Sequence, residues 1–60
     1  MMFRFAFAGF DFEWNKSHTV NVFLRNENID CFSLDYSRDD LSEGDAMIAA
    51  VEWVKAAANV

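Results

Sequence analysis

Proline is absent from this chain of 60 residues, cysteine occurs once and glycine only twice. A lone cysteine, Cys31, cannot form an intrachain disulfide, and small secreted domains usually depend on several. Two glycines are too few for a glycine-rich phosphate loop. We therefore predict a cytoplasmic protein without a cofactor. Dense packing or self-association must supply the stability that no disulfide provides.

Positive charge is also scarce, with five Lys and Arg residues against ten Asp and Glu residues and a net charge of −5. Tight binding to nucleic acid or to an anionic membrane needs a basic patch. The longest apolar run covers residues 46–51, far short of the roughly 20 residues of a membrane span. Residues 1–7 lack the basic segment and continuous apolar stretch of a signal peptide. We expect no direct contact with nucleic acid or membrane.

Residues with the chemistry of an active site are few. His18 and Cys31 are the only residues of their types, and a Cys–His nucleophile would need them in contact. The pattern instead puts His18 in a solvated turn and Cys31 inside a strand, where we expect it to be buried and inert. The acids of residues 39–45 lack the ligand spacing of a calcium loop, and no zinc ligand set is present. We predict no catalytic residue, no cofactor and no metal, and hence no enzyme.

The first part of the chain alternates apolar and polar residues with a period of two, which is typical of β-strands. Aromatic residues alternate over residues 3–7 and 10–14, with a slip of one residue between the segments. A bulge at Gly9 would keep one long bent strand. A tight turn there would instead form a hairpin, although alanine suits the first position of such a turn poorly. Both alternatives stay open. The hairpin would pair Phe3 with Trp14, Arg4 with Glu13, Phe5 with Phe12 and Phe7 with Phe10.

Two further strands are predicted over residues 19–25 and 29–36, with a polar turn at residues 26–28. Pairing across this turn would place apolar side chains on both faces of the hairpin, which is unusual for a small sheet. The predicted pairs are Phe23 with Phe32, Leu24 with Cys31 and Arg25 with Asp30.

Helical periodicity begins after Ser42, which resembles the first residue of a capping box with Asp45, and extends to about Asn59. Apolar residues gather on one side of this helix, whereas Ile48 falls in its polar face and Trp53 at its flank. The predicted fold class is α+β: an antiparallel β-meander of three to four strands followed by one C-terminal α-helix packed on one face of the sheet. Residues 1–60 are expected to form a single small domain.

Aromatic residues exceed what one helix can cover, since the chain holds seven Phe, two Trp and one Tyr. Each buried phenylalanine contributes about 1.5–3 kcal/mol, so several exposed rings would remove much of a marginal stability. We predict that the excess meets a second copy of the chain, most simply in a twofold homodimer. In the alternative, the sheet curls around its own aromatics, Ile48 is an ordinary exposed residue and Trp53 packs at the edge of the core. The candidate interface consists of Phe23, Phe32, Ile48 and Trp53.

The net charge lies in residues 30–45, which hold six acids against Arg38 alone. Such a patch could steer a basic partner, or it could be a solvated loop whose acids cap the helix. We predict a small intracellular interaction or regulatory protein that self-associates. The alternative is an acidic inhibitor that binds the nucleic-acid site of a basic partner through residues 30–45. The candidate acidic patch consists of Asp35, Asp39, Asp40, Glu43 and Asp45.

The strands followed by residues 44–50, Gly-Asp-Ala-Met-Ile-Ala-Ala, resemble the sheet-then-helix layout of the small antitoxin domains of bacterial toxin–antitoxin pairs. The resemblance covers about residues 29–56, and the segment Ser-Leu-Asp-Tyr at residues 33–36 stands where that layout has a glycine-rich strand end. Short acidic chains with a single cysteine are also similar in character to bacteriophage accessory proteins. A phage or mobile-element accessory role is one form that the predicted interaction protein could take.

Overall fold

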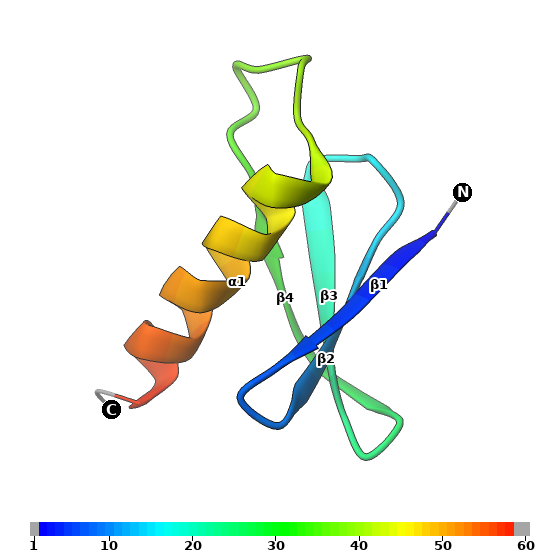
Figure 1. Cartoon of the computed structure of the whole chain (residues 1–60), viewed down its shortest axis with the longest axis vertical. Helices are drawn as coiled ribbons and strands as arrows, with labels where there is room; N and C mark the ends of the chain where they lie inside the picture. The colour runs from blue at the N-terminus through cyan, green and yellow to red at the C-terminus, as the bar shows by residue number, and fades with distance from the viewer. Residues whose placement is uncertain (1, 59–60) are drawn as a thin grey trace.

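Four strands and one helix make up the part of the chain that the structure describes. The computed structural model describes residues 2–58. The four strands lie in the sheet in chain order, each antiparallel to the next, so the sheet is a meander (Figure 1). The predicted α+β class is confirmed, with four strands. The elements are β1 (Phe3–Phe7), β2 (Phe10–Trp14), β3 (Thr19–Leu24), β4 (Glu27–Ser33) and α1 (Glu43–Ala58).

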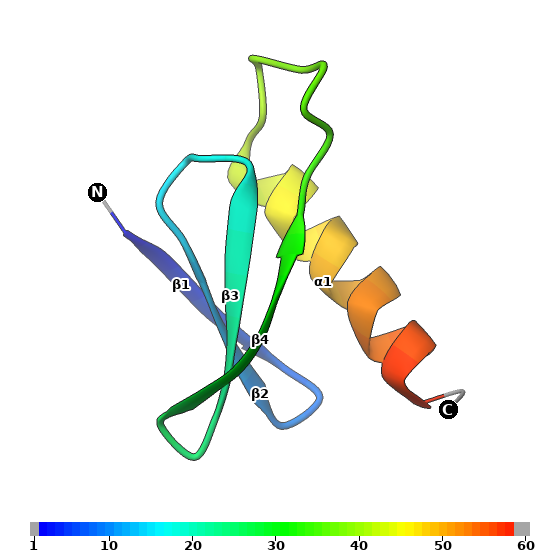
Figure 2. The same ribbon diagram turned by 180° about the vertical axis from the view of Figure 1, so that it is seen from behind.

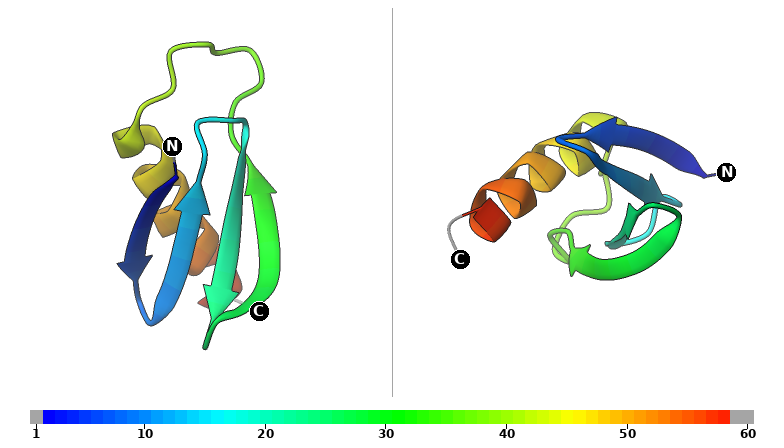
Figure 3. Two further views of the ribbon diagram at one scale, coloured as in Figure 1. Left: turned by 90° about the vertical axis from the view of Figure 1, so that its right-hand side faces the viewer. Right: turned by 90° about the horizontal axis from the view of Figure 1, so that it is seen from below.

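The helix α1 covers one face of the sheet. Figure 3 shows the four strands side by side with α1 behind them, crossing them diagonally. The connection between β4 and α1, residues 34–42, extends beyond the end of the sheet, as both Figure 1 and the reverse view in Figure 2 show. Because the strand order is β1-β2-β3-β4, the outer strands of the sheet are β1 and β4. The face of the sheet opposite α1 carries no helix among the described residues.

A two-residue turn joins β1 and β2. Ala8 and Gly9 have φ angles of 56° and 86°, and positive φ at both central positions is the mark of a type I′ turn, whose twist matches that of paired strands. The chain therefore forms the hairpin and not the single bulged strand. The register is the one that this hairpin requires: Phe3 pairs with Trp14, Arg4 with Glu13, Phe5 with Phe12 and Phe7 with Phe10.

The turn of the second hairpin lies earlier than predicted. Arg25 and Asn26 occupy it with φ angles of 53° and 68°, and β4 starts at the next residue. Asparagine tolerates the left-handed conformation better than most residues, so these two residues close a tight turn without the third residue of the predicted segment 26–28.

A β-bulge then shifts the register of β4 once more. Ile29 is an extra residue between two consecutive pairs of the β3–β4 ladder. The predicted pairings of Phe23 with Phe32, Leu24 with Cys31 and Arg25 with Asp30 are therefore wrong. Phe23 and Phe32 lie on opposite faces of the sheet, because side-chain direction alternates along each strand. The observed pairs are Thr19 with Ser33, Val20 with Phe32, Asn21 with Cys31, Val22 with Asp30, Phe23 with Asn28 and Leu24 with Glu27.

The core lies between α1 and the sheet face that it covers. Cross-strand partners share a face, so six of the seven phenylalanines point to the helix side, and Phe23 points to the other side. The opposite face is otherwise mostly polar. The β3–β4 hairpin still carries apolar side chains on both faces, as expected, but Phe23 and Cys31 now share the uncovered face. The sheet thus turns most of its phenylalanine rings toward the helix, although Phe12 and Trp14 are the aromatic residues that are fully buried there. The buried side chains are Phe12, Trp14, Val20, Val22, Leu34, Ala46 and Ala50.

The predicted capping box opens α1. The backbone N–H of Ser42 donates to Asp45 Oδ2 at 2.8 Å, and the backbone N–H of Asp45 donates to the Ser42 hydroxyl at 3.4 Å. Ala46 and Ala50, each with no exposed surface, form the face of α1 that meets the sheet. Because these side chains are small, α1 comes close to the sheet backbone, and its most extensive approach is to β1.

Candidate interaction surfaces

Two of the four predicted interface residues meet inside the protomer. The Trp53 ring packs edge-on against Phe10 and Phe12, with centroids 5.1 and 6.1 Å apart, and it stacks on Phe32 at 6.4 Å. Its Nε1–H donates to Asp30 Oδ2 at 2.9 Å. Trp53 and Phe32 are both half-buried, so they serve first as the edge of the core that lies toward β4.

The hydrogen bond from Trp53 also affects Asp30. This bond, followed by one from the backbone N–H of Cys31 at 2.8 Å, holds the pKa of Asp30 below its ordinary value. Asp30 lies on the helix side of the sheet, opposite Val22. A carboxylate at this position gives the indole a polar partner at the rim of the core.

The other two predicted interface residues are separated from this cluster. Ile48 is 67% exposed on the outer side of α1. Phe23 lies half-buried on the opposite face of the sheet. The structure therefore does not join the four residues into one surface.

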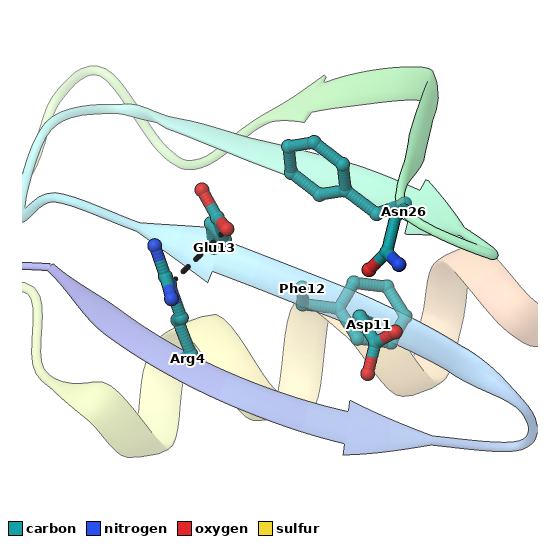
Figure 4. A pocket seen from close by; sticks show the side chains of 6 residues that line it. Arg4, Asp11, Phe12, Glu13 and Asn26 are labelled. Atoms are coloured by element: carbon teal, nitrogen blue, oxygen red, sulfur yellow. Dashed lines mark ion pairs between the residues drawn. The ribbon is translucent and has the colours of Figure 1, made fainter.

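Phe23 borders a hollow on the uncovered face of the sheet. Figure 4 shows Arg4, Asp11 and Glu13 around it, with Asn26 at the β3–β4 turn. Arg4 Nε lies 3.1 Å from Glu13 Oε2, and the Arg4 side chain is 73% exposed. Charged groups of both signs line this hollow, and the two large apolar residues of its lining are Phe12, which is buried, and Phe23.

The candidate acidic patch lies in the connection and the first turn of α1, and most of its acids have partners there. Arg38 Nε donates to Asp40 Oδ1 at 3.0 Å, and Arg38 Nη1 donates to Asp45 Oδ1 at 3.1 Å. The backbone N–H and hydroxyl of Ser37 donate to Asp35 Oδ1 at 2.9 and 2.6 Å. Asp39 and Glu43 are exposed. Most acids of the predicted patch therefore form hydrogen bonds or ion pairs within the connection and the first turn of α1.

These contacts lower three carboxyl pKa values. Hydrogen bonds from the Ser42 backbone and hydroxyl, and then from Arg38, hold the pKa of Asp45 below its ordinary value. The hydroxyl and backbone of Ser37 do the same for the pKa of Asp35, and the Arg38 guanidinium lowers the pKa of Asp40. Each carboxylate is therefore favoured in its charged form by a local donor.

His18 and Cys31 do not come together. His18 Nε2 lies 2.9 Å from the Arg38 carbonyl oxygen, and its ring stacks on Tyr36 with centroids 5.1 Å apart. This histidine is half-buried against the connection, and not simply solvated as expected. Cys31 pairs with Asn21 on the uncovered face and is exposed, so the expectation of a buried cysteine is wrong. The cause is the register of β4, which turns Cys31 away from the core.

An apolar surface that sequence reasoning missed lies along β1. Phe3 and Phe5 are half-buried, and Phe7 is 43% exposed. The ring of Phe5 stacks on Phe3 and on Phe12, with centroids 5.2 and 5.0 Å apart. The sequence signal was three phenylalanines within five residues, but only the topology shows that these residues form an outer strand.

The adjoining flank of α1 extends this surface. Met47 and Val51 lie about 120–160° around the helix from Trp53, which reaches toward β2 and β4. Because α1 lies closest to β1, this flank faces the free edge of β1. Met47 is 47% exposed and Val51 is half-buried. We call this surface the edge strip, and it consists of Phe3, Phe5, Phe7, Met47 and Val51.

No helix among residues 2–58 has the length and apolar character needed to cross a membrane. In the same part of the chain, no group of three or more His, Cys, Asp or Glu side chains is arranged to hold a metal ion. Comparison of the chain with models of protein families, with curated proteins and with solved structures found no match. The likeness to antitoxin domains therefore stays a resemblance of layout.

Proposed function

We propose that this chain is a small, non-enzymatic interaction or regulatory protein that acts as a homodimer. The observation that carries this proposal is the edge strip, in which exposed and half-buried apolar side chains line one outer strand and the neighbouring helix flank. Contiguous exposed apolar surface on a small protein is typical of a protein–protein contact. In a regulatory role, the homodimer would bind a partner protein through the surfaces that lie outside the dimer contact.

The energy available from this surface is large for a chain of 60 residues. Phe7 and Met47 are each nearly half exposed. Full burial of such a side chain contributes about 1.5–3 kcal/mol, so burial of the exposed halves in two copies would contribute about 3–6 kcal/mol before the cost of association. Domains of this size have a total stability of about 3–9 kcal/mol. Association itself costs about 4–15 kcal/mol, so a stable dimer must bury the half-buried members of the edge strip as well as these two side chains.

The assembly state tests the proposal directly. Light scattering coupled to size-exclusion chromatography, and sedimentation equilibrium from low to high micromolar concentration, should give a species of twice the 6.9 kDa protomer mass. The thermal midpoint should rise with protein concentration, because association stabilises the folded state by mass action. A folded monomer throughout this range, with a midpoint independent of concentration, would contradict the proposal.

The second candidate is an acidic inhibitor of a basic nucleic-acid-binding protein. The position of the connection favours it, since this segment extends beyond the sheet and carries exposed acids (Figure 1). Reversal of charge at Asp39, Asp40 and Glu43 should abolish binding to a basic partner and leave self-association intact. Unchanged capture of basic proteins by this variant would eliminate the inhibitor hypothesis.

A further inference from the structure

The two edges of the sheet differ in their capacity to accept another strand. β4 carries a bulge at Ile29 and acids at Glu27 and Asp30. Bulges and charges are the usual devices that keep an edge from pairing, and two acidic edges would repel each other. β1 has a regular register over all five residues, and its single charged residue, Arg4, is paired within the protomer. β1 is therefore the edge that can accept a strand.

We propose that β1 pairs antiparallel with β1 of a second copy, about a twofold axis at Phe5, so that two four-stranded sheets become one. This inference rests on the proposed function and names the surface and the register of the homodimer. Arg4 then lies opposite the partner's Ala6, and Phe3 lies opposite the partner's Phe7.

The hydrogen-bonding pattern of the β1–β2 hairpin determines which residues of β1 can pair with a second strand. In a hairpin closed by a two-residue turn, the residues next to the turn form a hydrogen-bonded pair, and such pairs alternate along the ladder. Phe7, Phe5 and Phe3 therefore bond to β2. The N–H and C=O groups of Arg4 and Ala6 point to the open edge. A twofold axis at Phe5 pairs Arg4 with the partner's Ala6 on both sides of the axis, which gives four hydrogen bonds.

Charge on the uncovered face favours the same register. Within the protomer, Arg4 faces Glu13 and Ala6 faces Asp11. The proposed pairing extends this row across the interface, in the order Glu13, Arg4, the partner's Ala6 and the partner's Asp11. Neighbouring strands are about 4.8 Å apart, and alanine is small, so the exposed Arg4 guanidinium can reach the partner's Asp11 while it keeps Glu13. A twofold axis at Arg4 would instead place two arginines side by side.

The edge strip completes the contact on the helix side. The first turn of α1 lies at the Phe3 end of β1, because Glu43 and Gly44 share a hollow with Trp14, the cross-strand partner of Phe3. Figure 3 shows this end of α1 beside the outer edge of β1. In the proposed register, the partner's Phe7 lies opposite Phe3, and Met47 follows one turn into α1. The dimer therefore brings together the two most exposed members of the strip, Phe7 and Met47.

Mixed cysteine variants test the register. In a Cys31→Ser background, chains with Arg4→Cys and chains with Ala6→Cys are mixed and oxidised. Cα atoms of a hydrogen-bonded antiparallel pair lie about 5.5 Å apart, within the range of a disulfide. The mixture should form a covalent dimer, whereas each variant alone should not, since identical positions lie about 9 Å apart across the axis. Cross-linking of either variant alone to the extent of the mixture would overturn this register.

A pair of lysine variants tests the edge without a new covalent bond. Ala6→Lys places a charge opposite the partner's Arg4, and Asn21→Lys adds the same charge on the same face of the sheet at an interior strand. Ala6→Lys should weaken dimerisation about tenfold or more, because the like-charge contact occurs twice. Asn21→Lys should leave the dissociation constant within about twofold. Both variants should keep the circular dichroism spectrum of the parent chain.

The outcomes separate the two proposals. A monomeric parent chain would overturn the homodimer and this inference together. A dimeric parent chain that gives no mixed cross-link, and that responds equally to both lysines, would overturn only the β1 pairing. Mixed cross-linking together with selective loss of dimerisation in Ala6→Lys would establish it.

Discussion

The type I′ turn at Ala8 and Gly9 predicts opposite effects for two exchanges of glycine and alanine. Ala8→Gly should stabilise the protein and Gly9→Ala should destabilise it. Both residues have positive φ, a conformation that costs an L-residue with a Cβ about 1–2 kcal/mol. Glycine avoids this cost but loses about 0.5–1 kcal/mol more backbone entropy on folding. The net effect is about 0.5–1 kcal/mol in each direction.

The site is well suited to isolate backbone strain. A Cβ atom added at Gly9 would meet no atom within 4 Å, so Gly9→Ala introduces neither a clash nor a new contact. Each kcal/mol corresponds to about 4–8 °C in the thermal midpoint of a domain of this size. We therefore expect shifts of about 2–8 °C, upward for Ala8→Gly and downward for Gly9→Ala.

Thermal and urea unfolding, followed by circular dichroism and by the fluorescence of Trp14 and Trp53, would measure these shifts at one fixed protein concentration. A bulged single strand would require positive φ only at Gly9, and Ala8→Gly would then lower stability by weakening a strand. A fall in the midpoint for Ala8→Gly, or no change for Gly9→Ala, would refute the assignment of this turn.

Three further predictions concern the core and the acids. Trp53→Phe keeps an aromatic ring beside Phe32 but removes the N–H donor to Asp30. The pKa of Asp30 should therefore rise toward its ordinary value, as measured by an NMR titration of the carboxyl carbons. An unchanged pKa would show that the bond is absent in solution. Four aspartates have pKa values lowered in the folded state. Their contribution to stability should be complete above about pH 5. It should disappear below about pH 4, as the pH falls through the pKa values of the folded state. Thermal midpoints measured from pH 7 to pH 2 would show this, and a loss of stability confined to the range from pH 7 to pH 5 would contradict it. Phe12→Ala removes a ring with no exposed surface and should lower the free energy of unfolding by about 3–5 kcal/mol, enough to unfold much of the population at 25 °C. Phe23→Ala, on the uncovered face, should lower it much less. Equal losses in urea unfolding would contradict the assignment of faces.

Local patterns predicted the elements of this protein well because they depend on neighbouring residues. Alternating aromatics predict the strands of the first hairpin, and the capping box of Ser42 and Asp45 predicts the start of α1. The first register also followed from the sequence once a turn was assumed, because only one pairing aligns the aromatics and sets Arg4 against Glu13. These features depend on spacing alone.

The register between β3 and β4 depended on information that a single sequence does not contain. A bulge at Ile29 has no local signature here, and one inserted residue reverses the direction of every side chain beyond it. Phe32 therefore joined the core and Cys31 reached the surface, contrary to expectation. The candidate interface, which assumed that Phe23 and Phe32 share a face, was separated for the same reason.

Composition and short-range spacing were sufficient to determine that this chain would form a meander and one helix, with little room to hide its rings. Only the tertiary structure decided which rings stay exposed, because that depends on how α1 crosses the sheet and on which strand is left at the edge. Burial is a property of residues far apart in the chain, such as Phe12 and Trp53, whose rings meet only when the sheet and helix pack together.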